Sequence, residues 1–155
     1  MALMSLVEMA TKCAVMIEKI EAEKRETLEI AAEMIEAEAK RVIGSYDYEW
    51  PQLAEATQDD REKRGFSRNE PGLRTGEMRE SIEHTIVSKD EAEIGSNDDN
   101  LVYFDLGTKT QPPRPVLEPA AIRKAPEIAA MTGEAVVAVM TSNESRIRKH
   151  LPNSS

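Results

Sequence analysis

Three aspartates in the second half of the chain are of the residue type that could hold a metal ion. Asp98 and Asp99 are adjacent, and Asp105 follows a few residues later. Carboxylate oxygens bind hard cations such as Ca²⁺, so the three could share one ion. A solvated turn with an aspartate capping the next helix uses the same residue types and needs no ligand. We expect the turn and cap, and no metal.

Histidine and cysteine are too sparse to build a transition-metal site. His84 and His150 are the two histidines, and Cys13 is the single cysteine. First-row metals need clustered nitrogen or sulfur ligands, and one cysteine forms no internal disulfide. Cys13 falls on the apolar side of a helical pattern, so we expect a small core residue and not a reactive thiol.

The short motifs of common enzyme classes are missing from the sequence. It has no Walker phosphate loop, no dinucleotide-binding glycine fingerprint, no His-Glu-x-x-His and no Gly-x-Ser-x-Gly. No carboxylate stands in a segment apolar enough to suggest a general acid in a dry pocket. The sequence therefore predicts a protein that is not an enzyme and that takes no cofactor. The competing enzyme hypothesis is a metal-dependent hydrolase, and analysis of the purified protein for bound metal would test it.

One long helix is predicted over residues 1–45. Residues 3–43 contain no glycine or proline, and Gly44 is placed to end the helix. Apolar residues recur there at steps of three and four: Leu6, Met9, Cys13, Met16 and Ile20, then Leu28, Ala31, Ile35, Ala39 and Val42. A helix of about 40 residues is roughly 60 Å long, so part of it should pack on another chain. The alternative is a helical hairpin broken near residue 24.

The rest of the chain is predicted to be an α+β core over residues 46–141 and a flexible tail over 142–155. Residues 83–88 and 91–95 have the pattern of an antiparallel hairpin. A short helix is expected from Gly76 to Ile82 with Thr75 as its N-cap, and residues 101–106 form either a strand or a helical turn. Residues 46–72 are a long connection, expected to be mobile over 58–70.

A C-terminal helix is predicted over residues 118–141, after a proline-rich segment. Its expected core face is made of Ile122, Ala125, Ala129, Val136 and Met140. The predicted fold class is thus α+β, with a long N-terminal helix, a small antiparallel sheet and a C-terminal helix.

The charge of −9 is unevenly distributed along the chain. Residues 1–60 carry 14 acidic and 6 basic residues, whereas residues 61–79 carry 6 basic and 3 acidic ones. An acidic protein does not grip the phosphate backbone of DNA over a broad face. The basic stretch 61–79 is either a solvated loop or a contact for an acidic partner. No run is long enough to cross a bilayer, and the N-terminus lacks the basic region of a signal peptide.

Two segments of the sequence point to a particular protein family more specifically than composition or charge does. The first is Trp50-Pro51-Gln52-Leu53, followed after a charged stretch by Gly72-Leu73-Arg74-Thr75-Gly76-Glu77-Met78-Arg79-Glu80-Ser81-Ile82. The second is Leu101-Val102-Tyr103-Phe104-Asp105-Leu106-Gly107-Thr108, followed by Pro113-Arg114-Pro115-Val116-Leu117-Glu118-Pro119-Ala120. Over residues 46–124 this resembles the phage neck and tail-completion family typified by the HK97 tail component and the Mu-type virion morphogenesis protein. Asp105-Leu106 stands where that family has Glu-Phe, Val116 where it has Phe, and Met78 where it has Leu.

The resemblance implies a structural virion protein, either a tail-completion or a tail-terminator subunit, made in the host cytoplasm and located at the head–tail junction. It implies a closed ring of identical subunits, expected to be a hexamer, that contacts the head connector and the tail tube while DNA passes through its lumen without specific binding. The expected interface residues are Trp50, Arg64, Arg68, Tyr103, Phe104, Gly107, Thr108, Arg114 and Pro115. The acidic N-terminal half and the basic stretch 61–79 are the expected complementary patches. The competing hypothesis is a helical interaction module that forms a coiled coil with a partner.

Overall fold

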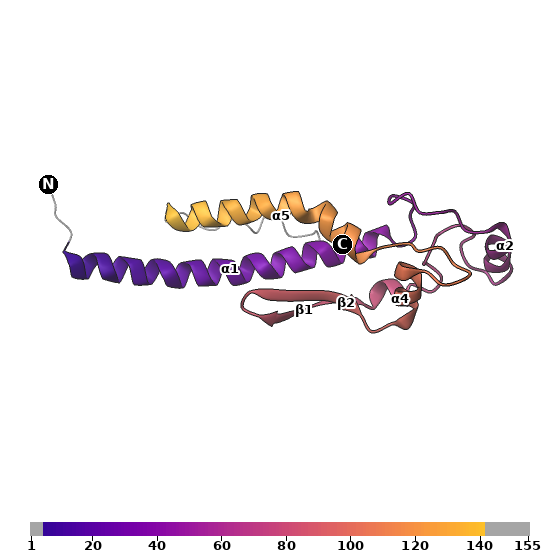
Figure 1. Ribbon diagram of the computed structural model, residues 1–155, viewed down its shortest axis with the longest axis horizontal. Coiled ribbons are helices and arrows are strands. Elements are labelled where there is room, and N and C mark those ends of the chain that lie inside the picture. Colours follow the sequence, from indigo (N-terminus) through magenta and orange to yellow (C-terminus); the bar gives the residue numbers. More distant parts are fainter. Residues whose placement is uncertain (1–4, 142–155) are drawn as a thin grey trace.

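The computed structural model describes residues 5–141, and the predicted tail 142–155, with His150, lies outside the described residues. The fold is α+β, as predicted. It has a long N-terminal helix, a two-stranded antiparallel sheet and a C-terminal helix (Figure 1).

Helix α1 (Leu6–Val42) is a single unbroken helix, so the hairpin alternative is wrong. It begins with a capping box, in which the Ser5 Oγ accepts from the Glu8 N–H at 3.1 Å and the Glu8 carboxylate accepts from the Ser5 N–H at 2.8 Å. Lys40 and Arg41 in its last turn suit the negative end of the helix dipole. At 1.5 Å per residue this helix is about 55 Å long.

Helix α5 (Leu117–Met140) runs antiparallel to the second half of α1. Ile30 and Met34 of α1 pack with Met131 and Ala135 of α5 in one buried cluster. Nearer the other end, Ala39 of α1 shares a second cluster with Ala120 of α5. The predicted range of this helix, 118–141, differs from the observed range by one residue at each end.

The hairpin of β1 (Ile82–Ser88) and β2 (Glu91–Ser96) confirms the predicted strands. Its register pairs Ile82 with Ser96 and His84 with Ile94. The hairpin lies along α1 on the side away from α5, so α1 is the central element of three (Figure 1). Most residues of β1 are exposed, so no other element within residues 5–141 covers its outer surface.

The main core lies where the ends of these elements meet the connecting segments. Its buried side chains include Val42, Ile82, Leu101, Val116 and the ring of Trp50. The Phe104 ring meets Trp50 edge to face, with centroids 5.3 Å apart, a favourable arrangement of two aromatic quadrupoles.

Two local predictions need correction, and one alternative that the sequence left open is resolved. Residues 58–70 are not a mobile loop, since α2 (Glu55–Lys63) forms there and the Arg61 side chain is buried. The short helix α3 (Glu77–Glu80) is smaller than predicted, and its N-cap is Gly76 at φ +89°, not Thr75. Residues 101–106 resolve as the helical alternative, α4 (Asp99–Leu106), with Asp98 as the cap that accepts from the Asn100 N–H.

Candidate assembly surfaces

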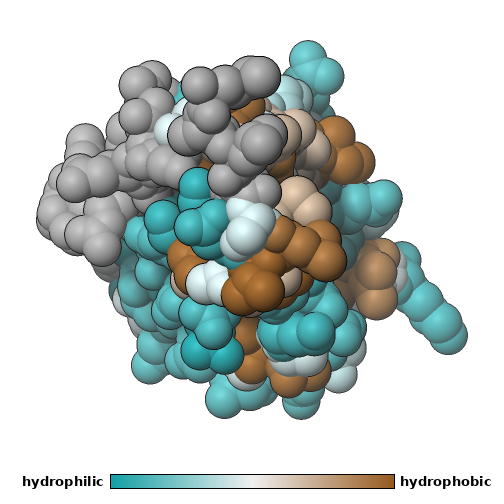
Figure 2. All heavy atoms as spheres, turned by 90° about the vertical axis from the view of Figure 1, so that its left-hand side faces the viewer, coloured by the Kyte–Doolittle hydropathy of each residue, from teal (hydrophilic) through white to brown (hydrophobic). Residues whose placement is uncertain are grey.

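The N-terminal part of α1 extends past the end of α5 and leaves an apolar stripe uncovered (Figure 1). We define the open stripe as Leu6, Met9, Cys13, Met16 and Ile20, all of which are exposed. Leu6 is 76% exposed and Ile20 is 45% exposed. Figure 2 views the molecule from this end and shows apolar side chains, in brown, among hydrophilic ones. The chain thus presents a hydrophobic helix face with no cover from residues 5–141.

The open stripe continues the line that α5 covers further along the same helix. From Ile20, steps of three and four residues lead through Glu23 to Thr27, Ile30 and Met34. The last three are buried, and Ile30 and Met34 pack on α5. The side of α1 that binds a helix within the chain is therefore the side left open between residues 6 and 20.

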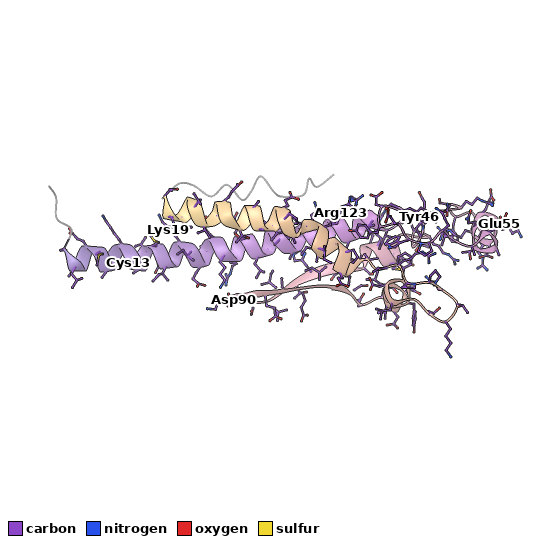
Figure 3. All side chains as sticks on the ribbon, turned by 45° about the horizontal axis from the view of Figure 1, so that its top comes forward. Cys13, Lys19, Tyr46, Glu55, Asp90 and Arg123 are labelled. Atoms are coloured by element: carbon purple, nitrogen blue, oxygen red, sulfur yellow. The ribbon has the colours of Figure 1, made fainter. Side chains whose placement is uncertain are left out.

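Cys13 was predicted to be a core residue, and this is wrong, because its side chain is exposed. Figure 3 places Cys13 on the part of α1 that projects beyond α5. The periodicity correctly predicted a helix here, but all five apolar residues of its predicted N-terminal core face are exposed. The periodicity could not show that α5 ends too early to cover this face.

The predicted core face of α5 is also wrong, because it points outward. Ile122 is 65% exposed and Met140 is 68% exposed, and the face formed by Ile122, Ala125, Ala129, Val136 and Met140 is exposed throughout. The buried face is instead made of Ala120, Met131, Ala135, Ala138 and Val139. Small alanines allow α5 to approach α1 closely. Both sides of α5 are therefore apolar. We call the exposed side, which carries Ile122, Ala125, Ala129, Val136 and Met140, the outer face of α5.

Three of the predicted interface residues, Trp50, Phe104 and Arg114, are buried inside the chain. The Arg114 guanidinium donates to the Pro51 carbonyl oxygen at 3.0 Å and lies 5.9 Å from the Phe104 ring centroid. From the sequence we expected Arg114 to lie at an interface between subunits. The Arg114 side chain instead binds groups within its own chain, and only 3% of the residue is exposed.

The other predicted interface residues lie on the surface. Tyr103 is 56% exposed, and Thr108 and Pro115 are exposed as well. Gly107 shapes the loop between them at φ +76°, and a Cβ there would stand 2.7 Å from the Pro113 nitrogen. Glycine is therefore required by both the backbone angle and the space.

Most arginines of the stretch 61–79 are engaged within the chain. Arg64 pairs with Asp60 at 3.0 Å, and Arg68 pairs with both Asp59 and Glu62. The hydrogen bond from Arg68 to Glu62 raises the pKa of that guanidinium, with the nearby Asp59 adding to the effect. Exposed pairs of this kind contribute little to stability, but they neutralise the patch. This weakens the case for a basic docking surface at Arg64 and Arg68.

A polar cluster at the end of α1 was not anticipated. The buried Glu38 carboxylate accepts from Arg41 at 2.9 Å and from the Tyr48 hydroxyl at 3.0 Å. The Arg41 hydrogen bond is the largest cause of the lowered pKa of Glu38. Burial, followed by the hydrogen bond to Glu38, raises the pKa of Tyr48 to about 12. The three-residue spacing of Glu38 and Arg41 on a helix can be read from the sequence. The hydrogen bond from Tyr48 to Glu38 cannot, because it depends on how the chain turns after α1.

A second unforeseen pair joins α1 to the hairpin. The Glu36 carboxylate accepts from the His84 backbone N–H at 3.1 Å and contacts the His84 Nδ1 at 2.5 Å. Burial raises the pKa of Glu36, but hydrogen bonds from Lys40 and His84 outweigh it, so the pKa lies below its ordinary value. His84 thus holds β1 against α1.

Two of the three aspartates considered for a metal make structural contacts, and Asp99 lies in the first turn of α4. Asp98 caps α4, and the Asp105 carboxylate accepts from the Val116 N–H at 2.6 Å and the Leu117 N–H at 3.3 Å at the start of α5. Over residues 5–141, no group of three or more His, Cys, Asp or Glu side chains is placed to bind a metal ion. In the same range, no helix is long and apolar enough to span a membrane.

Comparison with models of known protein families, with curated proteins and with solved structures found no match to this chain.

Proposed function

We propose that this chain is a structural virion protein of the phage head–tail junction, which assembles with copies of itself through α1 and α5. The observation that carries the proposal is the open stripe of α1, because it continues the line that α5 covers elsewhere on the same helix. An exposed apolar helix face of this length favours association with another chain.

The residues that carry the family resemblance support the proposal through their placement. Trp50, Phe104 and Val116 come from separate segments of the motif and share one buried cluster. Asp105, which stands at the family's glutamate position, caps the start of α5. Side chains from three parts of residues 46–124 thus meet in one core, which also includes Ala39 of α1 and Ala120 of α5.

A ring requires two different patches that meet around the circle. We propose that the open stripe of α1 on one subunit docks on the outer face of α5 on the next. Both are apolar and exposed, and they lie on different helices of the same chain. The internal pairing of Arg64 and Arg68 favours these faces over the charged patches expected from the sequence.

The role in the virion is tested by electron microscopy of phage particles made without this protein. Loss of a head–tail joining subunit should give full heads beside unattached tails, and adding the purified wild-type chain should restore joined particles. Normal joined particles in its absence would contradict the proposed role.

A coiled coil with a different protein is the second candidate, and the three-and-four spacing of the open stripe favours it. This candidate would be favoured if the purified chain stays monomeric by itself and forms a one-to-one complex with a helical protein encoded by a neighbouring gene. A closed homo-oligomer would favour the ring.

A further inference from the structure

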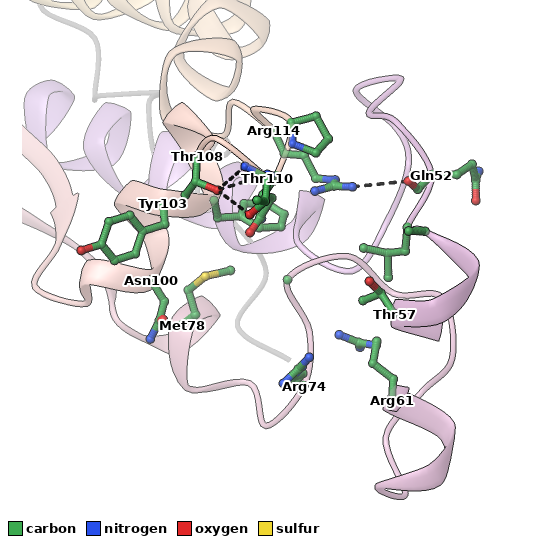
Figure 4. A pocket seen from close by; sticks show the side chains of 16 residues that line it. Gln52, Thr57, Arg61, Arg74, Met78, Asn100, Tyr103, Thr108, Thr110 and Arg114 are labelled. Atoms are coloured by element: carbon green, nitrogen blue, oxygen red, sulfur yellow. Dashed lines mark hydrogen bonds between the residues drawn. The ribbon is translucent and has the colours of Figure 1, made fainter. Parts of the chain in front are cut away.

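A pocket of about 830 Å³ lies on the far side of the main core from the open stripe (Figures 1 and 4). Its walls come from α2, from the segment around Gly72, from α4 and from the proline-rich segment before α5. This volume falls within the range of pockets that hold small ligands.

Three arginines line this pocket, and two of them are buried. Arg61 and Arg114 are each 3% exposed. Arg61 donates only to backbone carbonyls, those of Ser67, Glu70 and Leu73. Arg114 likewise donates to the carbonyls of Pro51 and Gln52. Carbonyl oxygens satisfy the N–H donors but carry no negative charge, so neither guanidinium is neutralised by a hydrogen-bonded carboxylate.

The third arginine, Arg74, adds a further positive charge at the same place. Arg74 is exposed, and Figure 4 shows its side chain beside that of Arg61. Burial lowers the pKa of Arg61, and the charge of Arg74 lowers it further, while Glu70 acts weakly in the opposite sense. Two guanidinium groups that face each other repel unless an anion lies between them.

The lining contains no aspartate or glutamate, although the chain has 29 of them and a net charge of −9. A buried charge without a counter-charge is destabilising. From this concentration of arginines we propose that the pocket binds the phosphate group of a small molecule. Arg61 and Arg74 would hold the phosphate oxygens, and Arg114 would add positive charge from the opposite wall.

Other donors and the size of the pocket fit a phosphate ester better than a bare ion. The hydroxyl of Thr57 and the amide of Asn100 line the same space. The pocket is several times larger than a phosphate ion, and the exposed Tyr103 is among the residues that line it. Arginine forks match the geometry of phosphate oxygens, and an aromatic ring can stack on a planar organic group.

Isothermal titration calorimetry of the full chain tests the proposal with three probes: inorganic phosphate, adenosine monophosphate and succinate. Both phosphates should bind, and the nucleotide should bind more tightly. The exposed Arg74 is changed to glutamine, and Arg64→Gln serves as the matched control, since Arg64 is exposed and outside the lining. Arg74→Gln should weaken phosphate binding about tenfold or more, because it removes a charge-assisted hydrogen bond to the phosphate. Arg64→Gln should leave it unchanged.

Absence of binding by both phosphates at millimolar concentration would overturn the proposal. Succinate binding as tightly as phosphate, or equal losses in the two variants, would also overturn it, because either would indicate general charge attraction. The pocket is separate from the open stripe and the outer face of α5, so this result does not depend on self-assembly.

Discussion

The Trp50 indole Nε1 donates a hydrogen bond to the Pro115 carbonyl oxygen at 3.1 Å, across 65 positions of sequence. This bond joins the connection after α1 to the segment that starts α5. Because the Trp50 ring is also buried against Phe104, one residue fixes the distance between the two helix ends.

Replacing Trp50 should therefore destabilise the chain in two separable steps. Trp50→Phe keeps an aromatic ring but loses the hydrogen bond, and should lower the free energy of unfolding by about 1–3 kcal/mol. Trp50→Ala also empties the core and should lower it by about 3–5 kcal/mol. Urea unfolding followed by circular dichroism measures both. A Trp50→Phe variant as stable as the wild type would contradict a separate contribution from the hydrogen bond, and equal losses for the two variants would contradict a separate contribution from ring packing.

Gly107 should not tolerate a side chain, whereas Gly65 should tolerate one better. Both have positive φ, +76° and +79°, but a Cβ at Gly107 would meet the Pro113 nitrogen at 2.7 Å, and a Cβ at Gly65 would meet nothing within 4 Å. We expect Gly65→Ala to cost about 1 kcal/mol from the backbone angle alone, and Gly107→Ala to cost at least about 1 kcal/mol more. Thermal unfolding of the two variants compares them. Identical melting temperatures would mean that the loop relaxes freely.

The Glu38 cluster predicts a loss of stability in acid. The folded state lowers the pKa of Glu38, so its contribution is fully present above the ordinary carboxyl pKa of 4.5. It is lost as the pH falls through the lower folded-state pKa. Glu38→Gln should thus reduce stability at pH 7 and flatten the decline below the ordinary carboxyl pKa. Glu29→Gln, on an exposed position of the same helix, is the control. An unchanged pH profile in Glu38→Gln would contradict this role.

The Cys13 thiol reports directly on the open stripe. It is exposed in the single chain, so it should react rapidly with a thiol reagent in dilute protein. If a second subunit covers the stripe, labelling should slow as protein concentration rises, and a bulky maleimide on Cys13 should block assembly. A labelling rate independent of concentration would show that the stripe stays open.

The sequence predicts those elements that follow from a local residue pattern, and it fails for those that depend on contacts with distant segments. Helix α1 follows from an uninterrupted helical pattern, and the hairpin follows from its strand residues. Helix α2 was missed because it is polar and is held by Arg61, which bonds to backbone carbonyls that no sequence pattern displays. Arg114 was misplaced for the same reason, since its partners are the carbonyls of Pro51 and Gln52.

The faces of α5 show a different limit. Ile122 and Met140 lie on one apolar side and Met131 on another, so periodicity alone could not choose the buried one. The choice depends on close approach to α1 through Ala120 and Ala135. The fold class could thus be predicted, whereas the assignment of core and surface on this helix could not.

The central claim, that the open stripe of α1 joins copies of this chain, is tested most directly by sedimentation velocity of the purified protein over a range of concentrations. Wild-type protein should sediment as a closed oligomer. Met16→Glu, which places a charge in the stripe, should shift it to monomer, while Thr11→Glu, with the same charge on the opposite side of α1, should leave the oligomer intact. A wild-type chain that remains monomeric at every concentration, or an oligomer unaffected by Met16→Glu, would contradict the claim.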